Sequence, residues 1–236
     1  MSTSSIRLQN HIQCVIFDLD GTLYATPRHF KAKVALRLVP QLNLLRHLGA
    51  AREEIRQETF ADRADLRRAL FASLSLRSGS APQVCETFYE EGFLRVFVEL
   101  LTKREARPGL VHVLKQLRRA EIRLAVLSDY AAIPERLAAL NIDRDLFDLL
   151  LSAEESGALK PSSRPFLEVA RRLGIEAKDT LVVGDRADMD QLGAKHAGMT
   201  FLGVADRPRS TQPQWTQSAT ALTSLASQRI ASPGPS

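Results

Sequence analysis

Two acidic residues two positions apart, Asp18 and Asp20, follow the apolar run "CVIF" in the segment "CVIFDLDGTLY". Carboxylates at the end of a buried segment need compensating partners, because an unpaired charge near an apolar core is unfavourable. Gly21 and Thr22 come next and offer backbone N–H groups. The segment therefore indicates a place where either structural partners or a chemical function stabilises two acids.

Polar residues also follow two further apolar runs. The run "LAVL" leads into Ser128 and Asp129, and the run "LVV" leads into Gly184 and Asp185. If these runs are parallel strands, their carboxyl ends open on one edge of a sheet, where ligands bind. Clustered carboxylates repel one another unless a cation lies between them, and an all-oxygen set of ligands suits Mg²⁺.

A positive side chain is available from Lys160 in "GALKPSSRPF", which follows the apolar run "LFDLLLS" through a short loop. Together with the Ser128 hydroxyl and the backbone N–H groups after Asp18, its ammonium would surround one point with donors. Such a set of groups, with Mg²⁺, suits a phosphoryl group.

The elements that must position these residues alternate between strand and helix. Short apolar runs at 12–17, 122–128, 146–152, 180–185 and 199–204 are separated, from residue 106 onward, by amphipathic helical segments. This alternation predicts an α/β fold with a parallel sheet and right-handed crossovers.

Residues 27–105 have a different pattern, with helical periodicity, many charges and few glycines. We expect Pro40 to break a helix there and Gly49 to end one. The sequence thus predicts a discontinuous core, 1–26 and 106–228, with an all-helical insertion at 27–105. The tail at 229–236 is predicted to be disordered.

Composition narrows the function classes. The net charge of the 236 residues is +5, but arginines alternate with acids in "AREEIRQETFADRADLRRAL". This pattern favours a solvated face with ion pairs over a nucleic-acid site. The sequence predicts no membrane partner, because no apolar run reaches the length of a spanning helix. The polar start predicts a cytoplasmic protein, and the two cysteines make no disulfide framework. The oligomeric state is left open.

The segments "DLDGTLY", "LSDY", "LKPSSRPF" and "GDRADMD" resemble, in their order and separation, the four motifs of the haloacid dehalogenase superfamily. The resemblance covers roughly residues 12–207. It implies a Rossmann-like sheet with a helical cap between the first and second motifs. It also implies a Mg²⁺-dependent phosphomonoesterase whose partner is a small soluble phosphate ester.

The resemblance implies a role for each matching residue. Asp18 would attack phosphorus and form an aspartyl-phosphate, and Asp20 would protonate the leaving alcohol and then deprotonate the hydrolytic water. Lys160 would screen the charge between Asp18 and the phosphate. The expected phosphate ligands are Gly21, Thr22, Ser128, Asp129 and Lys160, and the expected metal site comprises Asp18, Asp20 through its backbone carbonyl, Asp185 and Asp190.

Some positions differ from the family pattern or admit two roles. Asp190 is expected to hold a metal-bound water or Lys160, and Asp188 to face solvent. The family often has asparagine at the position of Asp129, which leaves a substrate contact there open.

Several alternative functions use the same core. A phosphoryl-transferring mutase would differ in what accepts the phosphoryl group, and a phosphonate hydrolase would need a cap lysine that forms an imine. Enzymes that hydrolyse carbon–halogen bonds lack the second aspartate, so Asp20 argues against that reaction. A non-catalytic scaffold would not need the intact set of acids and Lys160.

Overall fold

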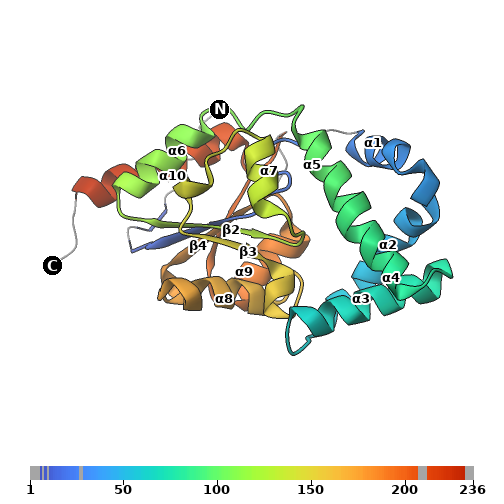
Figure 1. The fold of residues 1–236 in the computed structure, drawn as a ribbon. Coiled ribbons are helices and arrows are strands. Elements are labelled where there is room, and N and C mark those ends of the chain that lie inside the picture. The colour runs from blue at the N-terminus through green and yellow to red at the C-terminus, as the bar shows by residue number, and fades with distance from the viewer. Residues whose placement is uncertain (1–5, 7, 10, 27–28, 207–211, 232–236) are drawn as a thin grey trace.

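A sheet of five parallel strands forms the centre of the computed structural model, which describes residues 6, 8–9, 11–26, 29–206 and 212–231 (Figure 1). The strand order is β3-β2-β1-β4-β5. The strands are β1 (Cys14–Phe17), β2 (Arg123–Ser128), β3 (Leu149–Ser152), β4 (Thr180–Gly184) and β5 (Thr200–Gly203). All five lie within the predicted apolar runs, and the predicted α/β class is confirmed.

Helices cover both faces of the sheet. Helices α6 (Leu110–Arg119), α7 (Ile133–Ala139) and α10 (Trp215–Ala231) lie on one face, and α8 (Ser163–Leu173) and α9 (Leu192–His196) on the other (Figure 1). All four residues of the central strand β1 are therefore buried. A parallel strand covered on both faces requires a continuous apolar run, which explains the sequence "CVIF".

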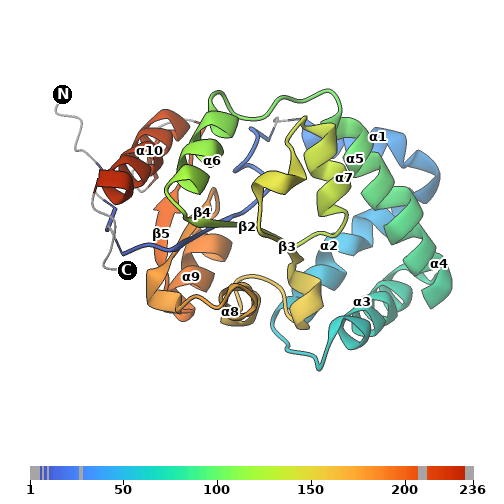
Figure 2. The same cartoon turned by 60° about the vertical axis from the view of Figure 1, so that its left-hand side comes forward.

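Among the described residues, the five helices between β1 and α6 form a group beside the sheet (Figure 2). They are α1 (Phe30–Arg37), α2 (Leu42–Arg56), α3 (Arg63–Ser78), α4 (Pro82–Thr87) and α5 (Arg95–Leu101), and a π-helical stretch at Phe88–Leu94 joins α4 to α5. We call this group the helical segment. The predicted cap boundary at residue 27 lies outside the described residues.

Two details of the sequence prediction are corrected. A 3-10 turn at Val39–Gln41 does separate α1 from α2 at Pro40, but α2 does not end at Gly49. It continues to Arg56, because Leu48, Ala51 and Ile55 form a buried stripe whose packing outweighs the low helix propensity of one glycine. The tail predicted to be disordered from residue 229 is helical as far as Ala231, and residues 232–236 lie outside the described residues.

The two chain connections to the helical segment meet at one point. The backbone N–H of Arg107 donates to the carbonyl of Leu23 at 2.8 Å. The buried Arg107 side chain also donates through Nε to the Thr22 carbonyl at 2.7 Å. The stretch of chain that leads into the helical segment and the stretch that leads out of it therefore lie side by side.

Shorter turns complete the fold. Single 3-10 turns lie at Arg144–Leu146, Ala153–Ser156 and Ala177–Asp179, and a π-helical turn lies at Ala187–Gln191. None of the helices in the described part of the chain is long and apolar enough to cross a membrane.

Candidate active site

The carboxyl ends of β1, β2 and β4 lie at one edge of the sheet. Strand β1 pairs with both β2 and β4, and Phe17 is level with Val126 and with Val183. Asp18 continues β1 by donating its backbone N–H to the Val183 carbonyl at 2.9 Å. Because the three strands end together, the polar residues that follow them share one region, as the sequence predicted.

Lys160 lies between β3 and α8 and contacts two of the acids. Its Nζ donates to Asp18 Oδ1 and to Asp190 Oδ1, each at 2.8 Å, and the residue is only 3% exposed. Burial lowers the pKa of Lys160, but the Asp18 and Asp190 carboxylates outweigh burial and raise it above its ordinary value. The ammonium therefore stays protonated and holds the two acids together.

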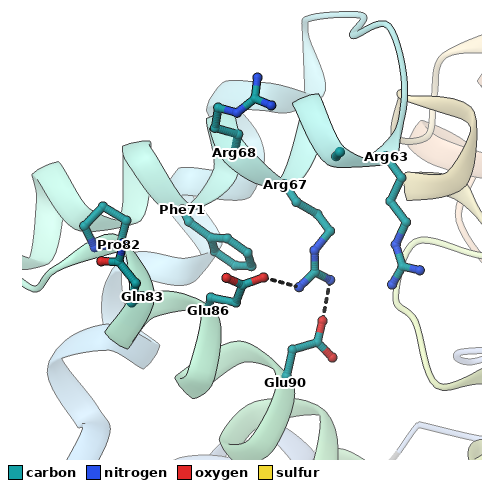
Figure 3. A pocket seen from close by; sticks show the side chains of 9 residues that line it. Arg63, Arg67, Arg68, Phe71, Pro82, Gln83, Glu86 and Glu90 are labelled. Carbon is teal, nitrogen blue, oxygen red and sulfur yellow. Dashed lines mark hydrogen bonds and ion pairs between the residues drawn. The ribbon is translucent and has the colours of Figure 1, made fainter.

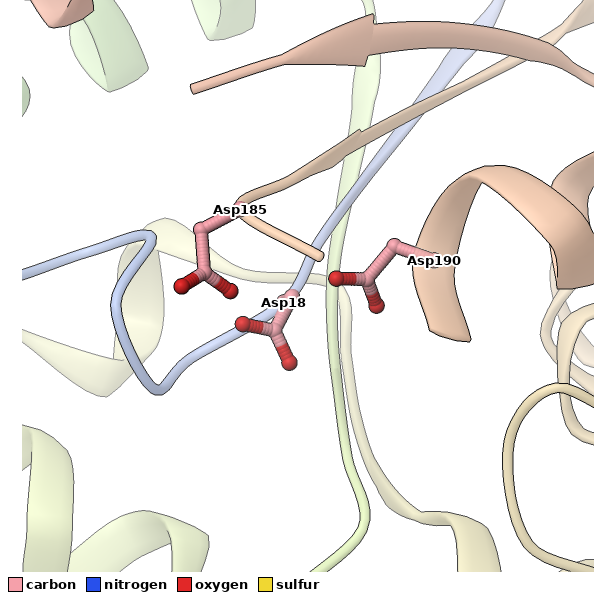
Figure 4. A group of neighbouring side chains, drawn as sticks. All are labelled: Asp18, Asp185 and Asp190. Carbon is pink, nitrogen blue, oxygen red and sulfur yellow. The ribbon is translucent and has the colours of Figure 1, made fainter. Parts of the chain in front are cut away.

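The Asp18, Asp185 and Asp190 carboxylates form a group whose ligand oxygens lie within 4.8 Å of one another (Figure 4). Oδ1 of Asp185 is buried and has no hydrogen-bond partner among the described residues. Burial, and then the Asp190 carboxylate, raises the pKa of Asp185 to about 7. A divalent cation would satisfy this oxygen and favour its charged form, so these residues fit Mg²⁺.

Both carboxylate oxygens of Asp190 accept hydrogen bonds from within the chain. Its Oδ1 accepts from Lys160, and its Oδ2 accepts from the backbone N–H of Arg186 at 3.2 Å. Asp190 thus holds Lys160 from one side, as Asp18 does from the other, whereas Asp185 has a buried oxygen without a hydrogen-bond partner among the described residues. Asp188 is exposed and pairs with Arg186.

The turn after Asp20 approaches the metal-site candidates closely. Gly21 has a φ of +85°, and a Cβ there would lie 2.2 Å from Asp185 Oδ2, so only glycine fits. The Thr22 hydroxyl donates to Asp18 Oδ2 at 2.9 Å. The Thr22 amide, which the sequence placed on the phosphate, donates to the Leu19 carbonyl at 3.3 Å. Thr22 therefore orients Asp18 through its side chain.

Asp20 lies beside this group with both carboxylate oxygens engaged. Its Oδ1 accepts from the Tyr24 hydroxyl at 2.8 Å, and its Oδ2 contacts the Arg136 guanidinium. Arg136 Nη1 also donates to Ser128 Oγ at 2.9 Å. Sequence reasoning did not identify Arg136. The available signal was an arginine on the buried stripe of "AIPERLAAL", next to Leu137.

The Asp129 side chain is not placed as the predicted phosphate ligand. Its Oδ2 accepts from Arg56 Nη1 at 2.7 Å, and its Oδ1 accepts from the backbone N–H of Lys160 at 3.0 Å. Both oxygens are thus used within the chain. Arg56 lies at the end of α2, so Asp129 connects the sheet edge to the helical segment.

A buried ion pair makes a second connection of this kind. Arg52 Nη1 on α2 donates to Glu154 Oε1 at 3.1 Å, and the side chains are 3% and 0% exposed. The Tyr89 hydroxyl donates to the same Glu154 oxygen at 2.6 Å, and Arg52 Nη2 donates to the Asp129 carbonyl at 2.7 Å. The predicted solvated face of "AREEIRQETFADRADLRRAL" is therefore wrong at Arg52.

A cavity of about 780 Å³ lies away from the acids, between α3 and α4 (Figure 3). Both acidic residues of its lining, Glu86 and Glu90, pair with Arg67. None of the predicted site residues lines it. The candidate active site is therefore the group at the sheet edge.

Comparisons with known proteins identify relatives of this chain in sequence and in structure. A model of haloacid dehalogenase-like hydrolases matches residues 12–198. A glyceraldehyde 3-phosphate phosphatase from Methanopyrus kandleri is 28% identical over 206 residues, which cover 82% of this chain and 84% of the relative. Phosphoglycolate phosphatase 1 from Pseudomonas aeruginosa is 30% identical, with 78% and 66% covered. The crystal structure of a 2-haloacid dehalogenase from Pseudomonas syringae superimposes with a TM-score of 0.58 at 27% identity, covering 93% of this chain and 98% of that one.

Proposed function

Because this chain belongs to the haloacid dehalogenase-like hydrolase family, we propose that it is a Mg²⁺-dependent phosphomonoesterase that forms an aspartyl-phosphate on Asp18. The relatives named as phosphatases support a small phosphate ester as substrate. The observation that carries the proposal is the position of Lys160. It holds Asp18 and Asp190 beside an Asp185 oxygen that has no hydrogen-bond partner among the described residues.

In this proposal Asp18 is the nucleophile. Lys160 and the Thr22 hydroxyl each hold one of its oxygens, which fixes the carboxylate at the end of β1. A carboxylate oxygen attacks phosphorus, and the bond from phosphorus to the leaving oxygen breaks. Lys160 favours this step because its charge lowers the repulsion between the carboxylate and the incoming phosphate.

Asp20 serves as acid and then as base. It gives a proton to the leaving oxygen in the first step and takes a proton from the attacking water in the second. In that second step the water oxygen bonds to phosphorus, the bond from phosphorus to the Asp18 oxygen breaks, and inorganic phosphate is released. Asp18 and Asp185 would hold Mg²⁺ in part, with the Asp20 carbonyl, and Asp190 would act through Lys160 or a bound water. When bound, the ion neutralises negative charge between nucleophile and phosphate.

The helical segment is the proposed cap, residues 27–105, over a core of 1–26 and 106–228. Phe93 and Phe97 pack on Tyr130 next to the sheet edge, with ring centroids 5.4 Å and 5.6 Å apart respectively. Side chains from this segment thus lie next to Tyr130, two residues after Ser128 at the end of β2. We propose that they select the substrate and exclude water.

Removal of the metal should abolish activity. We expect phosphate release to fall at least about a hundredfold in excess chelator and to return with added Mg²⁺, because several carboxylates must otherwise meet an anionic substrate. The measurement is phosphate release from a panel that includes phosphoglycolate, glyceraldehyde 3-phosphate and nucleoside monophosphates. Ca²⁺ is the control cation and should not restore activity, since it prefers more ligands and a looser geometry. Full activity in chelator would contradict the metal site.

A further inference from the structure

Arg136 is a buried charged residue that has no role in the proposed reaction as described so far. It lies on α7 among Ile133 and Leu137, and its side chain is 0% exposed. A guanidinium in an apolar setting destabilises a fold unless its donors are satisfied. Its Nε has no hydrogen-bond partner among the described residues. Fold stability alone therefore gives a weak reason for an arginine at this position.

The other donors of Arg136 are directed at the candidate active site. Nη2 contacts Asp20 Oδ2, and Nη1 donates to Ser128 Oγ at 2.9 Å and to the Tyr130 carbonyl at 3.3 Å. The guanidinium also lies 4.7 Å from the ring centre of Phe97 on α5. Ser128, Tyr130 and Phe97 thus hold the guanidinium through contacts other than the one with Asp20.

The contact with Ser128 leaves the predicted role of that hydroxyl available. A hydroxyl has one donor and two acceptor positions. Ser128 Oγ accepts from Arg136 and, at 3.2 Å, from the backbone N–H of Tyr130. Its own proton is not used in these contacts. The contact with Arg136 is therefore compatible with the predicted contact between Ser128 and phosphate.

We propose that Arg136 is the positioning residue for Asp20, and that with Tyr24 it holds the carboxylate in the orientation required for proton transfer. The two partners each bind one oxygen of Asp20. Rotation of the carboxylate would break both contacts, one of them charge-assisted, so the orientation is set before substrate arrives. This inference rests on the proposed phosphatase function.

The test compares two substrates that differ in their need for an acid. Dinitrophenyl phosphate has a leaving group that departs without protonation, whereas an alkyl phosphate such as glycerol phosphate needs a proton. The value of kcat/KM depends only on the steps up to and including the first phosphoryl transfer. It is therefore not affected by the role of Asp20 as a base in the second step. We expect Arg136→Met to lower kcat/KM for the alkyl phosphate by about 10²–10³-fold, and for dinitrophenyl phosphate by less than about tenfold.

Combination with Asp20→Asn tests whether Arg136 acts through Asp20. The double variant should be no slower on the alkyl phosphate than Asp20→Asn alone, because the residue being positioned is already lost. Arg136→Lys keeps the charge but can bind only one of the two partners well, so we expect partial recovery. Tyr24→Phe should show the same leaving-group dependence with a smaller loss, and it provides the comparison if Arg136→Met does not fold.

Arg123→Met is the matched control. Arg123 lies at the opposite end of β2 from Ser128 and is largely exposed. The same chemical change there should leave kcat/KM unchanged for both substrates. Equal losses on both substrates would overturn the proposal, and so would losses that multiply in the double variant, which would place Arg136 on the substrate itself. A wild-type chain inactive on both substrates would instead contradict the proposed function.

Discussion

Replacement of Asp18 by asparagine should reduce phosphatase turnover by at least about 10⁴-fold. The amide cannot form the acyl-phosphate bond, and no other carboxylate is held by both Lys160 and Thr22 in the described part of the chain. The shape of the side chain is kept, so the fold should be unchanged. The measurement is phosphate release under saturating Mg²⁺, with circular dichroism to confirm folding.

Asp188→Asn is the matched control for this substitution. Asp188 lies in the same motif as Asp185 and Asp190, but it is exposed and pairs with Arg186. We expect its turnover to stay within about twofold of wild type, because surface ion pairs contribute little. Near-native turnover of Asp18→Asn would contradict a covalent mechanism on Asp18, whatever the control shows.

Replacement of Arg52 by methionine should lower the free energy of unfolding by about 3 kcal/mol. Removal of one partner from a buried ion pair leaves the other charge without compensation, and Glu154 is 0% exposed. This loss is at the low end of the range for a buried ion pair that loses one partner, because Glu154 keeps two other contacts. Tyr89 still donates to Glu154 and the Arg67 guanidinium lies 3.8 Å from it. Denaturant unfolding followed by circular dichroism measures the change.

Two further variants check the physical reason. Arg68→Met removes an arginine that is 76% exposed and pairs with Asp65, and it should change stability by less than about 0.5 kcal/mol. The double variant Arg52→Met with Glu154→Leu should be more stable than Arg52→Met alone, because no buried charge is then left unpaired. If the double variant loses as much as the two single variants together, the ion pair is not the source of the effect.

The local pattern of apolar and polar residues along the sequence was sufficient to predict the sheet and the acidic residues at its edge. Each strand is an apolar run, and all but β5 end in or lead directly into a polar residue. Parallel strands covered on both faces need such runs. Asp18, Asp185 and Lys160 could therefore be placed together before any contact was known. Their roles in the reaction remain proposals.

The contacts between distant parts of the chain could not be predicted in this way. Arg52 and Glu154 are separated by 102 positions, and Arg136 and Asp20 by 116. Nothing in the local sequence specifies which of many acids such an arginine will meet. A charged residue within a buried helical stripe, as at both arginines, was the available signal. The composition around Arg52 favoured a solvated face because most of its neighbours are indeed on the surface.

The hydrogen bond between Arg107 and Leu23 bears on how this architecture can diversify. It joins the stretch of chain that enters the helical segment to the stretch that leaves it. With its two ends held together in this way, the segment is a closed loop attached to the sheet. The entropy of closing a loop depends only logarithmically on its length, and a doubling changes the free energy by about 0.6 kcal/mol. Chain entropy alone therefore sets little limit on the length of this segment, and the stronger limit is that a replacement must still supply partners for Glu154 and Asp129, which Arg52 and Arg56 provide here.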